Sequence, residues 1–186
     1  MTAEVIRGLF ALAGYIATIF AANWFVAHVG TVCAPDGPCL IPVGFGLMAP
    51  SGVLWVGAAL FLRDLVQDAL GRRATVVGIL LGAALSTFAA GPALAVASGA
   101  AFLLSELADF LVYTPLRERG RHVLAVLSSG VVGSLVDSAV FLWLAFGSLA
   151  FLAAQFVGKT EVTALCAALV WLWRRRAAAA QVAPAR

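Results

Sequence analysis

Residues 51–73 read SGVLWVGAALFLRDLVQDALGRR. The first twelve of these residues are apolar enough to lie in a bilayer, but the run then carries Arg63, Asp64 and Asp68 before it closes on Gly71 and two arginines. A charged side chain at the centre of a membrane helix costs about 2.5–3.5 kcal/mol on insertion scales. This stretch therefore predicts a membrane helix whose charged side chains face protein instead of lipid.

The composition of the whole chain is that of an integral membrane protein. Hydrophobic residues make up 63% of the 186 positions and charged residues 11%, whereas a soluble domain is about half apolar and about a quarter charged. The net charge of +3 does not indicate nucleic-acid binding, because the arginines lie in short clusters beside apolar segments, where membrane topology explains them.

Six segments are long enough to cross the bilayer, which takes roughly 20 apolar residues. They are 9–29, 51–70, 74–90, 93–113, 123–146 and 151–173. They predict an all-α bundle of six transmembrane helices in one domain over residues 1–176, followed by a disordered cytoplasmic tail at 177–186. A β-barrel is not expected, because strict alternation of apolar and polar residues is absent.

The placement of Lys and Arg predicts the orientation of the bundle. The loops 30–50, 91–92 and 147–150 contain neither residue, whereas the opposite ends of the segments carry arginines at 7, 72–73, 117–121 and 174–176. Cytoplasmic loops are enriched in Lys and Arg. Both termini should therefore be cytoplasmic, in a multi-pass protein of the bacterial cytoplasmic (inner) membrane.

Charged residues inside the predicted helices point to a polar pathway or a ligand site. The insertion cost makes accidental placement of so many implausible, so they should face the bundle interior. They are Arg63, Asp64, Asp68, Glu106, Asp109, Asp137, Lys159 and Glu161.

Asp137 and Lys159 are predicted to form an ion pair. Each lies about 12–14 Å below the same membrane boundary at 1.5 Å per residue, and a tight turn joins their two helices. Such a pair can bind a ligand, or it can only fix helix packing, since a buried pair contributes little net stability.

The remaining carboxylates fall into pairs on helix faces. Asp64 and Asp68 are four residues apart and Glu106 and Asp109 are three apart, so each pair shares a face. Arg63 can partner one of these four carboxylates. Asp68 and Asp109 lie close enough to helix ends to be only interfacial.

Three other features keep more than one interpretation. Glu161 can pair with Arg63 or line a site, and Asn23 can contact a ligand or a neighbouring helix. Cys33 and Cys39 lie six residues apart in an outer loop, where either a disulfide or free thiols are consistent with the sequence. The Cys and His spacing fits no metal site.

The sequence favours a transporter over an enzyme. It has no Walker A motif, no HExxH and no Ser/His/Asp arrangement, so we expect no catalytic residues and no cofactor. A carboxylate accepts two adjacent N–H groups directionally. An interior rich in carboxylates therefore suits a ligand with several N–H donors, such as a purine-like base or an amine.

Four motifs in order resemble the vitamin uptake transporter (VUT) family, also called the queuosine precursor transporters. The segment Asp64-x-x-x-Asp68-x-x-Gly71 resembles the family's D-x-x-x-[ED]-x-x-G. The stretches SELADFLVYTPLRERG (105–120), SGVVGSLVDSAVFLWLAF (129–146) and FVGKTEV (156–162) resemble its later motifs, with Asp109, Asp137 and Lys159 at the matching positions.

This resemblance implies a six-helix inner-membrane importer of 7-deazapurine queuosine precursors, chiefly 7-cyano-7-deazaguanine. It also implies a fold akin to the substrate-binding components of energy-coupling-factor transporters. The expected substrate-binding residues are Asn23, Asp64, Glu106, Asp109, Asp137 and Lys159, with Arg63, Asp68 and Glu161 as secondary lining or pairing residues. Arg63 departs from the family, which usually has a small residue there.

The resemblance and the residues leave three functional classes to separate. The chain is a deazapurine carrier, a substrate-binding subunit that needs an ATP-driven partner, or an assembly protein whose polar core only fixes the bundle. The expected partners are the lipid bilayer and a small 7-deazapurine. The sequence is also consistent with a homo-oligomer or with an energy-coupling partner. Proton coupling and facilitated diffusion are both consistent with the sequence.

Overall fold

The computed structural model describes residues 2–33, 37–92 and 94–182 and is mostly helical over them. Its helices are α1 (Ala3–His28), α2 (Val53–Ala89), α3 (Ala95–Glu118), α4 (His122–Phe146) and α5 (Leu152–Val182). Among the described residues, α1 to α4 are long and apolar enough to cross a membrane. Helices satisfy every backbone polar group internally, which lipid requires. The fold is therefore that of a multi-pass, mainly α-helical membrane protein.

The chain reverses direction inside α2, at Gly71. This residue has φ 81° and ψ 173°, a conformation open essentially to glycine alone. Just before the break, Leu70 lies against Gly8 near the start of α1. After the break, Gly82 lies against Ile19, further along α1. The two halves of α2 therefore run in opposite directions along α1.

The predicted count of six helices is not confirmed, because the described residues form five helical elements. The predicted segments 51–70 and 74–90 are the two halves of α2. Gly71 turns the chain without the three-residue loop that the prediction placed at 71–73, since one glycine with a positive φ is enough for the reversal. The predicted helix end at Gly71 is therefore a break within one element.

A three-stranded antiparallel sheet lies in the region that was predicted to be the long outer loop. Its strands are β1 (Val32–Cys33), β2 (Cys39–Val43) and β3 (Leu47–Pro50), in the order β1-β2-β3. The turn η1 (Gly44–Gly46) joins β2 to β3. A disulfide joins Cys33 to Cys39, which face each other across β1 and β2. This sheet is a departure from the all-α prediction.

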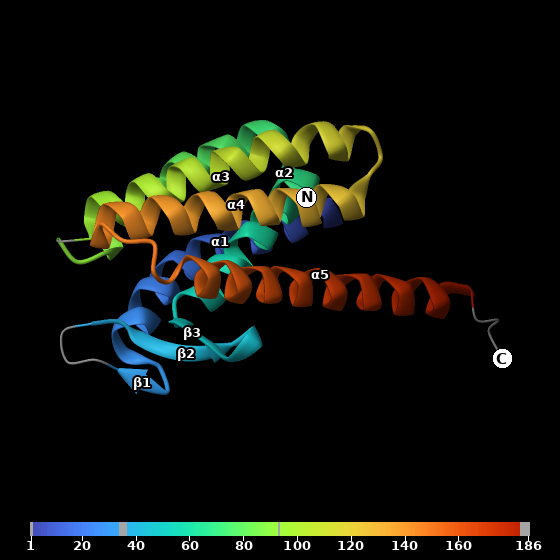
Figure 1. Cartoon of the computed structure of the whole chain (residues 1–186). Coiled ribbons are helices and arrows are strands. Elements are labelled where there is room, and N and C mark those ends of the chain that lie inside the picture. Colours follow the sequence, from blue (N-terminus) through green and yellow to red (C-terminus); the bar gives the residue numbers. More distant parts are fainter. Residues whose placement is uncertain (1, 34–36, 93, 183–186) are drawn as a thin grey trace.

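The two ends of the bundle differ in charge. Arg72, at the break in α2, pairs with Glu118 at the end of α3, so the arginine-bearing turns lie together. We call this the basic end, formed by residues 71–73 and 117–121. The sheet lies at the opposite end, together with the turns at 90–92 and 147–151, and we call this the hairpin end (Figure 1).

The last helix is longer than predicted. α5 continues to Val182, six residues into the segment 177–186 that was predicted to be a disordered tail. Four consecutive alanines at 177–180 account for the extension, because alanine has the highest helix propensity. Residues 183–186 lie outside the described residues, and the tail stays a prediction there.

Candidate functional site

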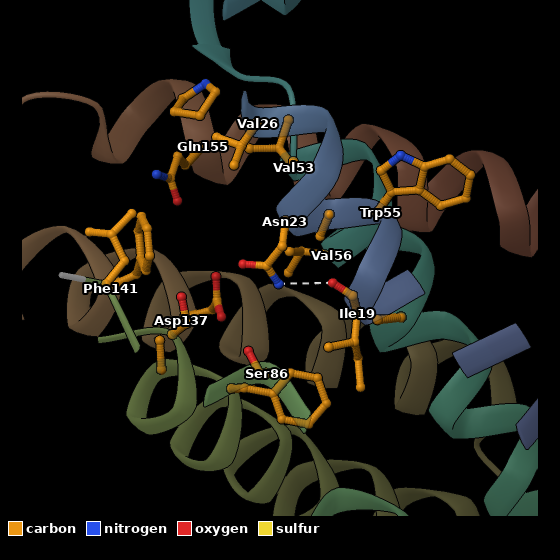
Figure 2. A pocket seen from close by; sticks show the side chains of 18 of the residues that line it. Ile19, Asn23, Val26, Val53, Trp55, Val56, Ser86, Asp137, Phe141 and Gln155 are labelled. Atoms are coloured by element: carbon orange, nitrogen blue, oxygen red, sulfur yellow. Dashed lines mark hydrogen bonds between the residues drawn. The ribbon is translucent and has the colours of Figure 1, made fainter. Parts of the chain in front are cut away.

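A cavity of about 520 Å³ lies among the helices at the hairpin end. All five helices contribute to its lining, and Pro38 and Pro50 contribute from beside and within the sheet. Much of the wall is apolar and includes Ile19, Val53 and Phe141 (Figure 2). Ligand sites in proteins are mostly apolar cavities with a few placed polar groups, and this cavity has that composition.

Polar side chains from different helices turn toward the same space in this cavity. Figure 2 shows Asn23 of α1, Ser86 of α2, Asp137 of α4 and Gln155 of α5 around it. The amide nitrogen of Asn23 donates to the carbonyl of Ile19 at 2.9 Å, one turn back in its own helix. The amide oxygen of Asn23 therefore remains as an acceptor toward the cavity.

The predicted ion pair between Asp137 and Lys159 is formed at the edge of this cavity. Lys159 is 1% exposed, and its Nζ donates to Asp137 Oδ2 at 2.5 Å. It also donates to Ser138 Oγ and Gln155 Oε1, both at 2.8 Å. An ammonium group has three donors, so all three are used. Lys159 thus fixes its neighbours and keeps no donor for a ligand.

Close packing of α2 against α5 sets the position of Lys159. A Cβ atom at Gly57 would lie 2.6 Å from the backbone oxygen of Lys159, so only glycine allows the helices to approach this closely. One turn further along α5, Thr163 Oγ1 donates to the carbonyl of Gly57 at 2.9 Å. The small residue and the interhelical hydrogen bond are devices that membrane helices use to associate.

A second charged cluster lies around Arg63, which is 1% exposed. The guanidinium pairs with Asp109, with Asp64 at 3.0 Å and with Glu106 at 3.5 Å. It also donates to Gln67 Oε1 at 3.2 Å. One cation therefore faces three carboxylates, and the formal charge of the cluster is +1 − 3 = −2. We call Arg63, Asp64, Glu106 and Asp109 the Arg63 cluster.

The structure divides the predicted substrate-binding residues into two groups. Asn23, Glu106, Asp137 and Lys159 line the cavity at the hairpin end. Asp64 and Asp109 do not line it; they surround Arg63, which holds Asp109 by its closest contact.

The secondary residues also differ in their surroundings. Asp68 accepts hydrogen bonds from the Tyr113 hydroxyl at 2.9 Å and from Arg117 Nε at 2.7 Å, as suits a position close to the basic end. Glu161 accepts a hydrogen bond from the backbone nitrogen of Gly44 at 3.3 Å. It therefore contacts the turn of the sheet, and neither Arg63 nor the cavity is its partner.

Several polar residues of the cavity were missed at the level of sequence. Gln155, Ser86, Ser98 and Ser105 all line it. Gln155 carried a usable signal, because it lies four residues before Lys159 and so on the same helix face. The serines carried none, since serine also occurs in membrane helices as an ordinary small packing residue.

The comparison with protein families agrees with this arrangement. The family described as putative vitamin uptake transporter matches residues 86–174. This match supports assigning the chain to that family. The family indicates a transporter of the vitamin-uptake type. No curated protein and no solved structure matches the chain significantly.

The family match covers one part of the site. The matched residues run from the end of α2 through α3 and α4 into α5. They include Glu106, Asp109, Asp137 and Lys159. Asn23 and Arg63 lie outside the match, so their roles are argued from the structure alone.

Proposed function

We propose that this chain imports a 7-deazapurine base, 7-cyano-7-deazaguanine or a close relative, across the bacterial inner membrane. The observation that carries the proposal is the cavity at the hairpin end. Asn23, Glu106 and Asp137, whose side chains carry acceptor oxygens, line it among apolar side chains, and its volume is about 520 Å³. Acceptor groups spaced around an apolar cavity suit a flat heterocycle with N–H groups at its edge.

The hydrogen-bonding groups of a guanine-like base match those of the cavity. The base presents a ring N–H beside an exocyclic amino group, and a carboxylate accepts both in a directional, charge-assisted contact. Asp137 is the best-placed acceptor, because Lys159 engages only its Oδ2 atom and a carboxylate has about four lone-pair sites.

Gln155 supplies the complementary donor. Its Oε1 atom accepts from Lys159 Nζ, which fixes the amide so that its NH₂ group is available to a ligand carbonyl. Lys159 thus acts on the ligand through Asp137 and Gln155. The apolar wall, which includes Phe102 and Phe141, offers aromatic faces on which a base can stack.

The orientation of the chain suits uptake from outside. The positive-inside rule supports a cytoplasmic location for the arginine-bearing basic end, and with this orientation the hairpin end and its cavity would face outward. The disulfide between Cys33 and Cys39 then lies on the outer face, where an oxidising environment allows it to persist.

Binding and uptake test the proposal directly. The purified chain in nanodiscs should bind 7-cyano-7-deazaguanine, and Asp137→Asn should weaken binding by about tenfold to a hundredfold, the range of one lost hydrogen bond to a charged group. Glu118→Gln at the exposed basic end is the matched control and should bind as the native chain does. The proposal is wrong if the native chain binds no 7-deazaguanine base.

One observation favours the substrate-binding subunit as a second candidate function. Ala13 and Ala17 lie four residues apart on the exposed face of α1, and small residues at this spacing allow another helix to approach closely. An ATP-driven partner could dock there. Liposomes that contain only the purified chain separate the two functions, because uptake without any partner excludes an obligatory one.

A further inference from the structure

A second cavity lies nearer to the basic end, and its volume is about 530 Å³. Its lining includes Asp64 and Asp68 of α2, Tyr113 of α3 and His122 at the start of α4. It shares no lining residue with the cavity at the hairpin end. We call the two spaces the outer and the inner cavity. The chain therefore has two mainly apolar cavities, each with a few charged or polar side chains in its lining, and protein between them.

The Arg63 cluster lies between these cavities. Glu106 lines the outer cavity and Asp64 lines the inner one, and the guanidinium of Arg63 pairs with both. Arg63 itself is 1% exposed and lines neither cavity. A ligand that moves from the outer to the inner cavity by the direct route must pass this side chain.

The contacts of Arg63 are unequal. It holds Asp109 and Asp64 closely, but its Nε atom is 3.5 Å from Glu106 Oε2. Within the part of the chain that the structure describes, both of these atoms are buried and lack a hydrogen-bond partner. A buried carboxylate oxygen without a donor costs free energy. Glu106 Oε2 therefore has a longer contact to the guanidinium than the other two carboxylates of the cluster, and Glu106 also lines the outer cavity.

We propose that Arg63 is the gate between the two cavities and that the N–H groups of the substrate compete with it for Glu106. When the substrate engages Glu106, the guanidinium keeps Asp109 and Asp64 and loses its weakest partner. It then turns toward the inner cavity, where Asp68 lies one helical turn beyond Asp64 and adds a carboxylate at that side. This inference rests on the proposed function and adds the route that the substrate takes.

The first test removes the gate without changing the charge of the cluster. Arg63→Gln combined with Asp109→Asn deletes one positive and one negative charge, so the formal sum stays −2. The reporter is Val126→Cys, in the inner cavity, with Cys166→Ala removing the free thiol. In the native background, a small membrane-impermeant thiol reagent should label the reporter from the basic side only.

In the double variant the reporter should react from both sides of the membrane, as measured in intact cells and in inverted vesicles. Arg72→Gln with Glu118→Gln is the matched control, because it too removes one cation and one carboxylate, but from an exposed pair. The reporter in this control should stay protected from the hairpin side. Arg63→Lys is the second variant, since a lysine is a point charge that cannot bridge several carboxylates. Protection in both Arg63 variants would overturn the gate.

The competition for Glu106 is tested by affinity. The double variant should bind 7-cyano-7-deazaguanine about tenfold more tightly than the native chain, because Glu106 no longer shares its acceptor with Arg63. Weaker binding would overturn the competition. The labelling experiment uses no substrate, so it remains decisive for the gate even if the deazapurine proposal fails.

Discussion

Replacing Lys159 tests whether the buried ion pair serves stability, binding or both. Lys159→Met keeps the length of the side chain but removes three hydrogen bonds, to Asp137, Ser138 and Gln155. Removing one partner of a buried pair costs about 3–5 kcal/mol, because an uncompensated charge remains. The side chain of Asp137 is 12% exposed, so water in the cavity can reach it. We therefore expect a loss near the lower bound, about 3 kcal/mol.

The double variant Lys159→Met with Asp137→Leu separates the two roles. Replacing a buried ion pair by apolar residues is often neutral or stabilising, so most of the lost stability should return. Ligand binding should not return, since the acceptor is gone. A steric-trap or denaturant titration in micelles measures the free energy of unfolding, and calorimetry measures binding.

Two outcomes would refute this reasoning. If Lys159→Met costs less than about 1 kcal/mol, the pair is worth no more than an exposed one, and the buried geometry does not hold in the membrane. If the double variant keeps native affinity, Asp137 is not a ligand-binding residue. The polar core would then only fix the bundle, as the assembly-protein hypothesis states.

Three further predictions address the fold. Gly71→Ala should destabilise the chain by about 1–3 kcal/mol, because alanine is strained at the φ of 81° that reverses α2; a denaturant titration measures this. Gly57→Ala should cost about 1–3 kcal/mol through the clash with α5, whereas Gly91→Ala, with nothing within 4 Å of the added Cβ, should leave stability unchanged. Mass spectrometry after alkylation in denaturant should show one modified cysteine without reductant and three with it, because Cys33 and Cys39 are disulfide-bonded; three modified cysteines without reductant would contradict the bridge.

Most of the helical architecture was predictable because bilayer thickness dictates the length of apolar segments. The three-stranded sheet was not predictable from the sequence, for a physical reason. Its two longer strands, Cys39–Val43 and Leu47–Pro50, are short apolar runs whose periodicity does not distinguish strand from loop or buried helix. The usable signal was the Gly-Phe-Gly turn between them, since two short runs separated by three residues with glycine indicate a hairpin.

The partners of the buried charges were only partly predictable. Depth along two adjacent helices was enough to predict the pair of Asp137 and Lys159, because a tight turn fixes their relative position. Arg63 had several carboxylates within reach, and sequence spacing cannot rank partners on other helices. The packing of α3 against α4 decides which carboxylate lies closest to Arg63. Gly133 lets α4 approach the side chain of Asp109, and this holds that carboxylate beside Arg63.

The distribution of charge limits what the outer cavity can bind. Its described lining contains one cation, Lys159, and two carboxylates, Glu106 and Asp137. All three donors of the cation are engaged by protein atoms, so an anionic ligand would find acceptor oxygens and no free charged donor. Like charges in a low-dielectric site repel strongly. We therefore expect the site to favour a neutral, N–H-rich heterocycle over its phosphorylated derivatives.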